Sequence, residues 1–327
     1  VVQLLHTAKR ESVQAVNETM VFVYFEVGRM IVEQEQEGND RAKYGSELLR
    51  HLSEVLTEEF GKGFSVSNIQ QMRNFYLAYR NQQTLSVNSL TNGKRFGLSW
   101  SHYLLLIRID DLEERRFYEI EASKNKWSVR ELQRQYDSAL YTRLALSRDK
   151  NKIKELSEKG LVIETPQDAI KDPYILEFIG LPEQSSYSEN DLEQQLIDKL
   201  EHFLLELGTG FTFVARQKRI SFDDKHFRID LVFYNRILRC FVLIDLKIGE
   251  LKHQDIGQMM MYVHYYDREL KLEEENSTVG IILCQNKSES VVRYTLPHNN
   301  EQIFASKYKT VLPSKEKLKA LLKEKTK

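Results

Sequence analysis

Three charged residues interrupt two apolar, strand-like segments in the second half of the chain, and they constrain the fold more than any other feature. Asp230 lies in the segment 229–235, and Asp245 and Lys247 lie in the segment 240–249. A strand that buries one face normally keeps its charges on the other, and a buried carboxylate without a partner is costly. These side chains therefore either face water or take part in chemistry.

The alternation of side chains along a strand decides which of these groups can meet. Asp245 and Lys247 are two residues apart, so they share one face of their strand. If the two segments are antiparallel neighbours in a suitable register, Asp230 meets Asp245 at one end of the sheet, beside Lys247. Clustered carboxylates repel each other and attract either a proton or a hard divalent cation, and Mg²⁺ prefers oxygen ligands.

Lys247 adds a cation to this expected cluster. An ammonium group can orient an attacking water and offset the charge that develops on a phosphate. Metal-dependent hydrolysis of a phosphodiester is the chemistry that uses all three groups. The sequence therefore predicts Mg²⁺ as the cofactor, with Mn²⁺ as a substitute.

The spacing of hydrophobic residues along the sequence divides the chain into three parts. Residues 1–155 follow a helical period, and residues 156–190 form a connector with proline, glycine and a serine-rich polar stretch. Residues 191–327 change to strand-like alternation in the order α-β-β-β-α-β, and the helix between the third and fourth strands predicts a parallel crossover. We therefore predict an α+β protein of two domains, all-α at the N-terminus and α/β with a mixed sheet at the C-terminus.

Two of the expected helices in the first domain form a helix-turn-helix pattern. Residues 47–60 carry a helical stripe that ends at a glycine-containing turn, and a second helix follows, for which Ser67 can act as the N-cap. A helical hairpin within a bundle has the same pattern as a DNA-reading motif. The sequence thus leaves open whether this domain binds DNA or oligomerises.

Charge and composition limit the partners. The net charge is −1 and the pI is about 6.8, so any DNA-binding surface must come from a local patch. No apolar run is long enough to span a bilayer and no signal-peptide pattern opens the chain, so we expect a cytoplasmic protein without a membrane partner. The two cysteines and eight histidines show no zinc-binding spacing.

The strand-borne acidic residues resemble a known signature. Asp230, followed by the triplet 245–247 (Asp-Leu-Lys), looks like the PD-(D/E)xK nuclease motif, with Ile229 where the motif has proline. The chemistry uses the carboxylate, so this departure leaves the resemblance intact.

Two further elements match the same superfamily. Glu193 lies on the helix that leads into the sheet, and Gln258 and Tyr262 form a QxxxY motif on the helix that follows the triplet. Nearly the full length resembles the YhcG-like family of PD-(D/E)xK proteins. The resemblance implies a DNA endonuclease linked to restriction, mobile elements or DNA repair, with a winged-helix-like helical domain and a restriction-endonuclease-like domain at 191–327. It also implies the catalytic residues Glu193, Asp230, Asp245, Lys247, Gln258 and Tyr262, with Glu193, Asp230 and Asp245 as metal ligands.

Each of these residues also has a purely structural interpretation. Glu193 can be a solvated residue near a helix N-terminus, and Gln258 and Tyr262, four residues apart, can simply pack on one helix face. At the level of the whole protein, the alternatives are a noncatalytic DNA-binding or scaffold subunit that keeps the nuclease fold, and a protein-interaction subunit of a restriction complex. The expected partners are DNA and either a second copy of the chain or a restriction-system protein. An acidic cluster favours catalysis, because negative charge weakens simple binding of phosphate.

Overall fold

The computed structural model divides the chain into two compact units, Val1–Gln133 and Arg134–Lys327. The residues that it describes are 2–37, 41–80, 96–146, 150–181, 187–222 and 224–311. The segments 134–155 and 156–190, which the sequence assigned to the helical domain and to the connector, fall within the second of these units. Across the described ranges, no helix combines the length and the apolar character needed to cross a membrane.

The described part of the first unit is helical, as predicted. Its helices are α1 (Val2–Glu37), α2 (Arg41–Phe60), α3 (Val66–Tyr79), α4 (Trp100–Leu106), α5 (Leu112–Lys124) and the beginning of α6 (Val129–Asp137). A cluster of aromatic rings forms much of its core, with centroids 5.0–6.2 Å apart among Phe25, Phe75, Tyr79, Phe96 and Tyr103. Gly28 allows α1 and α3 to approach closely, because a side chain there would collide with the carbonyl group of Met72.

The expected turn between α2 and α3 is present, but the N-cap differs from the predicted residue. Gly61 and Gly63 adopt positive φ angles of 79° and 123°, which glycine accepts without strain. The cap of α3 is Ser65, whose hydroxyl accepts a hydrogen bond from the Asn68 amide at 3.3 Å. Ser67 lies one residue inside the helix, so it cannot occupy the N-cap position.

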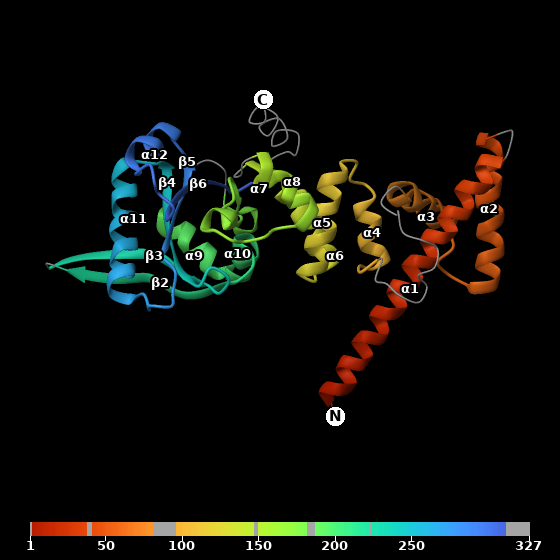
Figure 1. Ribbon diagram of the computed structural model, residues 1–327, viewed down its shortest axis with the longest axis horizontal. Coiled ribbons are helices and arrows are strands. Elements are labelled where there is room, and N and C mark those ends of the chain that lie inside the picture. Colours follow the sequence, from red (N-terminus) through yellow and green to blue (C-terminus); the bar gives the residue numbers. More distant parts are fainter. Residues whose placement is uncertain are drawn as a thin grey trace. The chain divides into compact units, whose positions relative to one another are not determined.

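The second unit is an α/β domain built on one mixed sheet (Figure 1). The sheet order is β1-β6-β5-β4-β3-β2, with β2, β3 and β4 antiparallel and the remaining neighbours parallel. The strands are β1 (Tyr174–Ile175), β2 (Phe211–Phe222), β3 (Lys225–Asn235), β4 (Cys240–Glu250), β5 (Val279–Asn286) and β6 (Ile303–Lys309). The helices are α7 (Leu140–Leu146), α8 (Lys150–Lys159), η2 (Pro166–Ala169), η3 (Glu177–Ile179), α9 (Glu189–Asp198), α10 (Leu200–Leu207), α11 (His253–Tyr265), η4 (Tyr266–Leu270) and α12 (Glu289–Thr295).

The predicted core order α-β-β-β-α-β is confirmed by α9 and α10, then β2, β3 and β4, then α11 and β5. The predicted parallel crossover is also confirmed, since α11 connects β4 to its parallel neighbour β5. Two strands extend the sheet beyond this core. They are β6, near the end of the described chain, and β1, which lies inside the predicted connector and pairs with β6.

Helices cover the two faces of the sheet. In Figure 1, α11 lies on one side of the sheet, and α9 and α10 lie on the other. Leu192 of α9 and Phe203 of α10 pack with Leu231 and Phe233 of β3 in one apolar layer. On the other side, Met259 of α11 packs in a second layer with residues of β4 and β5. This arrangement buries β4 on both faces and leaves its end as the place where polar groups can gather.

A fully buried ion pair fixes α10 inside this unit. Arg143 of α7 and Glu206 of α10 are both 0% exposed and form a charge-assisted hydrogen bond. Glu206 also accepts a hydrogen bond from the Ile175 amide at 2.9 Å, while Arg143 donates to the Ser138 carbonyl at 2.8 Å. Burial opposes ionisation of Glu206, but the charges of Arg143 and Lys171, together with the hydrogen bonds from Arg143 and the Ile175 amide, outweigh burial and lower the pKa of the carboxyl group.

We expect Arg143→Met to destabilise the protein strongly. It keeps the bulk of the side chain but removes the cation that bonds to Glu206, leaving the more distant Arg134 and Lys171 near the buried carboxylate. Breaking a buried pair in this way typically costs about 3–5 kcal/mol. Urea denaturation of the full chain measures the loss. The control is Lys154→Ala, which breaks an exposed pair with Glu158 and should cost less than about 1 kcal/mol. Equal stability of the two variants would show that the buried pair contributes nothing beyond packing.

Candidate active site

The register between β3 and β4 brings the two predicted aspartates to the same place. Leu231 and Ile244 are the last paired residues at this end of the two strands, and Asp230 and Asp245 are the next residue of each strand. The Asp230 carboxylate also accepts a hydrogen bond from the Leu246 amide at 2.8 Å, so it lies against the strand that carries Asp245. The meeting of these two groups at one end of the strand pair follows from the alternation of the sequence and from the antiparallel register.

A glutamine that the sequence analysis missed links two of the carboxylates. The Gln217 side-chain amide donates one hydrogen bond to Glu193 and another, of 3.1 Å, to Asp230. Gln217 lies on β2 between two paired positions and has a φ angle of 46°, in the left-handed region that non-glycine residues avoid. Local strain of this kind is found at positions that the surrounding structure over-determines, often functional ones.

Asp245 is the most deeply buried acid of the predicted set, at 2% exposure. Burial first, and then the nearby charge of Asp230, raise its pKa to about 7, against the opposing effect of Lys247. The Lys247 ammonium lies 2.9 Å from Oδ2 of Asp245 in an ion-pair contact. Among the described residues, no donor meets that buried oxygen with hydrogen-bond geometry.

Lys247 lies between two acids. Besides Asp245, its ammonium lies 3.8 Å from the carboxylate of Glu189, at the first turn of α9. Burial lowers the pKa of Lys247, but the negative charge of Asp245, with further contributions from Glu189 and Asp230, outweighs this effect and raises the pKa. Glu189 also accepts a hydrogen bond from the Ile248 amide at 3.2 Å, so it joins the start of α9 to the end of β4. The sequence analysis did not select Glu189.

Glu193 is placed by α9 at the edge of the same cluster. It is 5% exposed, and burial raises its pKa, with a further increase from Asp230 and a partial reversal by Gln217. Arg216 of β2 lies 3.8 Å from its carboxylate. Glu193 is therefore a partnered, buried acid rather than a solvated residue of the first helical turn.

The two residues of the QxxxY motif support the neighbouring strand. Gln258 donates to the hydroxyl of Tyr262, and that hydroxyl donates to the backbone carbonyl of Arg228 at 2.8 Å. Arg228 lies two residues before Asp230 on β3. Gln258 and Tyr262 thus contact the backbone of the strand that carries Asp230, and this hydrogen-bond chain helps to position β3.

The acidic groups do not form a closed metal cage in this conformation. Within the described residues, no group of three or more His, Cys, Asp and Glu side chains is arranged to hold a metal ion. The amide of Gln217 lies between Glu193 and Asp230 and bonds to both. Asp245 contacts Lys247 instead.

The geometry agrees with the results of comparisons with known proteins. Residues 167–323 match the family described as the YhcG PDDEXK nuclease domain, and residues 1–143 match the family described as the DUF1016 N-terminal domain. The Escherichia coli (strain K12) protein named "Putative nuclease YhcG" is 38% identical over 341 aligned residues, which cover 97% of this chain and 90% of that protein. This chain belongs to the YhcG family.

Two solved structures are similar to parts of this YhcG-family chain. A repair endonuclease from Pyrococcus abyssi is 17% identical with a TM-score of 0.28, and covers 40% of this chain and 50% of its own. EndoMS in its apo form is 16% identical with a TM-score of 0.25, and covers 40% of this chain and 49% of its own. The chain therefore spans about half the length of each of these structures.

We expect Gln217→Ala to destabilise the protein by about 1–3 kcal/mol, because it leaves Glu193 and Asp230 facing each other without a shared donor. Gln217→Gly loses the same amide but relieves the left-handed backbone, so it should be about 1 kcal/mol more stable than the alanine variant. Urea denaturation without divalent metal gives both values. If both variants are as stable as the wild type, Gln217 does not help to hold these carboxylates together.

Proposed function

We propose that this chain is a divalent-metal-dependent DNA endonuclease. The observation that supports the proposal most directly is that Asp230 and Asp245 both lie just beyond the last pair of the β3–β4 ladder. Lys247 contacts Asp245, and Glu193 is joined to Asp230 through Gln217. The YhcG PDDEXK family match across residues 167–323 adds independent support.

The donor set fits a hard cation such as Mg²⁺ or Mn²⁺. All three proposed ligands, Glu193, Asp230 and Asp245, supply carboxylate oxygens, which these ions prefer. Oδ2 of Asp245 is buried without a well-aligned hydrogen-bond donor in the described structure, so it has an unused lone pair. A divalent ion bound by these oxygens would offset their repulsion and polarise a phosphoryl oxygen.

The residues around these ligands have separate tasks in this proposal. The ammonium of Lys247 orients the attacking water and offsets negative charge that develops on the phosphate. Glu189, 3.8 Å from the Lys247 ammonium, helps to hold that group in place. Gln217 keeps Glu193 and Asp230 together, and its hydrogen bonds would have to give way for these carboxylates to hold a divalent ion. Tyr262 and Gln258 hold the backbone of β3 in place.

Metal binding is testable without any measurement of activity. Mg²⁺ or Mn²⁺ at about a hundredfold excess over its dissociation constant should stabilise the wild type by about 2.7 kcal/mol, because it binds the folded state. The double variant Asp230→Asn with Asp245→Asn should lose this stabilisation, seen as a thermal shift in calorimetry.

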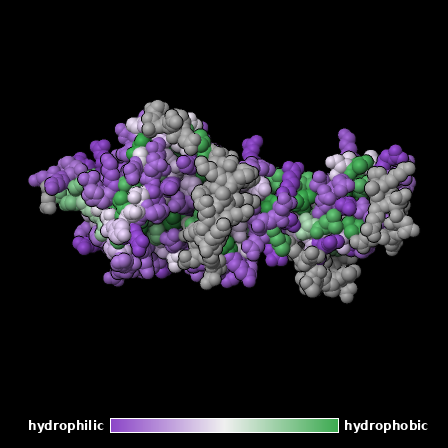
Figure 2. Space-filling model, turned by 90° about the horizontal axis from the view of Figure 1, so that it is seen from above, coloured by the Kyte–Doolittle hydropathy of each residue, from purple (hydrophilic) through white to green (hydrophobic). Residues whose placement is uncertain are grey.

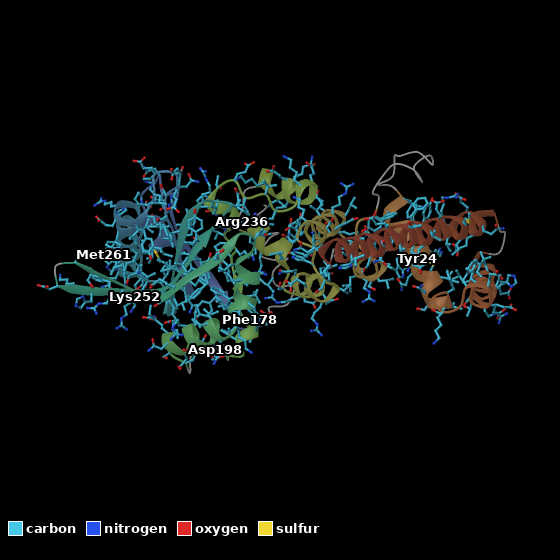
Figure 3. The ribbon with its side chains drawn as sticks, turned by 90° about the horizontal axis from the view of Figure 1, so that it is seen from below. Tyr24, Phe178, Asp198, Arg236, Lys252 and Met261 are labelled. Carbon is cyan, nitrogen blue, oxygen red and sulfur yellow. The ribbon has the colours of Figure 1, made fainter. Side chains whose placement is uncertain are left out.

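The matched control for this measurement removes two exposed acids of the same unit, Asp198→Asn with Glu201→Gln; Asp198 is labelled in Figure 3. The control should keep the metal-induced shift. A shift that persists in the Asp230/Asp245 variant would place the ion elsewhere in the protein.

Lys247→Ala tests the catalytic assignment. It removes the proposed water-orienting cation and leaves the carboxylates, so cleavage of DNA should fall by on the order of a hundredfold or more while the metal-induced shift remains. A gel assay with Mg²⁺ or Mn²⁺ measures the rate. Lys252→Ala is the control, because Lys252 is an exposed lysine at the start of α11, labelled in Figure 3.

The outcomes separate the two functional readings. Cleavage at an unchanged rate in Lys247→Ala would remove this strand from the active site. Wild-type protein that binds metal and DNA but cleaves neither duplex, single-stranded nor branched DNA would favour the noncatalytic scaffold.

A further inference from the structure

The hairpin formed by β2 and β3 extends well past the rest of the sheet. The two strands pair from Phe211 and Asn235 at one end to Phe222 and Lys225 at the other. The third strand, β4, pairs with β3 only as far as Leu231. Figure 1 shows the two strands continuing beyond α11 as a projecting ribbon. We call residues 218–222 and 225–229 the arm.

One face of the arm is anchored to α11. Ile220, Phe222 and Phe227 belong to the apolar layer on the α11 side of the sheet. The rings of Phe222 and Phe227 stack with centroids 5.2 Å apart, and Tyr265 of α11 lies 6.3 Å from Phe222. An isolated two-stranded hairpin is marginal in water, so this packing is what holds the arm in a fixed position.

The opposite face of the arm carries a pair of arginines. Arg219 and Arg228 lie directly opposite each other on neighbouring strands, and both are exposed. The next rung on the same face is Ser221 and His226, which share a hydrogen bond of 2.9 Å. In Figure 2, the end of the arm at the far left of the molecule is mostly hydrophilic on the visible side.

This arginine pair opposes folding stability. Like charges at directly opposed positions of an antiparallel pair are destabilising. Among the described residues, neither Arg219 nor Arg228 forms an ion pair with a carboxylate, whereas Arg216, nearer the core, contacts both Glu193 and Gln194. Asp224, at the tip of the arm, is exposed as well. Two adjacent guanidinium groups without an acid between them are suited to an anion from outside the protein.

The position of the pair relates that anion to the candidate active site. Arg219 is two residues from Gln217, and Arg228 is two residues from Asp230, and these two inner residues are hydrogen-bonded to each other. Two residues of a strand span roughly 7 Å. Successive phosphates of one DNA strand advance by about 3.4 Å along the helix axis. The arginines are therefore placed to reach phosphates close to one that lies at the carboxylates.

We propose that the Arg219–Arg228 face of the arm binds the sugar–phosphate backbone of duplex DNA beside the bond to be cut. Guanidinium groups make paired hydrogen bonds to phosphate, and a two-stranded ribbon is an element that the major groove of B-DNA admits. The reference to a cut bond rests on the proposed function. The binding itself does not.

The test is DNA binding by the full chain in EDTA, which suppresses cleavage. Fluorescence anisotropy with a labelled duplex is recorded over a range of salt concentrations. The variant Arg219→Ala with Arg228→Ala should bind roughly fiftyfold more weakly at about 0.1 M salt, because two phosphate contacts and the ions that they release are lost. The slope of log affinity against log salt should fall by about two.

The matched control removes two charges from the other face of the same arm. Lys218 and Lys225 pair with Ile229 and Phe222, which belong to the layer against α11. Lys218→Ala with Lys225→Ala should keep the wild-type salt slope. Arg219→Lys with Arg228→Lys keeps the charges, so it should keep most of the slope and lose affinity through the missing paired hydrogen bonds.

Folding is monitored separately. Loss of a like-charged pair should leave the melting temperature of the double alanine variant unchanged or raise it, so a binding defect cannot be assigned to unfolding.

Several results would overturn the proposal. They are an unchanged salt slope in the arginine variant, an equal loss of DNA affinity in the lysine control, and a wild type that does not bind duplex DNA.

Failure of the proposed role of the arm is distinguishable from failure of the proposed function. If the arginine variant and the wild type bind DNA equally while Lys247→Ala loses cleavage, the proposed role of the arm in DNA binding is wrong and the nuclease assignment stands. If the arginine variant loses DNA binding but the wild type shows no metal-dependent cleavage, the proposed role of the arm stands and the nuclease assignment fails.

Discussion

Mutual repulsion between carboxylates is the constraint on which this fold depends at the candidate active site. The antiparallel pairing of β3 and β4 ends next to Asp230 and Asp245, and α9 adds Glu193, which Gln217 links to Asp230. Such a cluster is tolerated only if each acid has a compensating partner. Lys247 lies against Asp245, the Leu246 amide binds Asp230, and Gln217 is shared by Asp230 and Glu193. Three strands and one helix are therefore held in register by polar contacts that an apolar core alone would not specify.

The sequence was most informative where the physical signal is local. The period of two along 240–249 placed Asp245 and Lys247 on one face, and charges inside apolar runs marked Asp230 as unusual. The helix between two buried strands was enough to predict the parallel crossover from β4 to β5, which the structure contains. The family signature joined these elements to Glu193 and to the motif on α11.

Other features depend on contacts between distant parts of the chain, and no local pattern reports them. Gln217 resembles any polar residue of an alternating strand, and its importance comes from an irregular register and a left-handed backbone. The buried pair of Arg143 and Glu206 joins residues far apart in sequence. In the same way, β1 consists of a short segment whose pairing with β6 cannot be seen from composition. The N-cap of α3 lies two residues before the predicted Ser67. Two serines near the turn could each act as the N-cap, and only the backbone conformation selects Ser65.

The hydrogen bond from Tyr262 to the carbonyl of Arg228 joins two regions that otherwise have separate roles. Arg228 presents its side chain on the arm, while its backbone is held by α11, and the chain reaches Asp230 two residues later. A ligand that orders the arm and an ion that orders the carboxylates would therefore act on the same short piece of backbone. If the two binding events are coupled through this backbone, thermodynamic reciprocity requires each ligand to change the affinity for the other by the same factor. The tyrosine hydroxyl would then make substrate and metal cooperative ligands, although neither of them touches it.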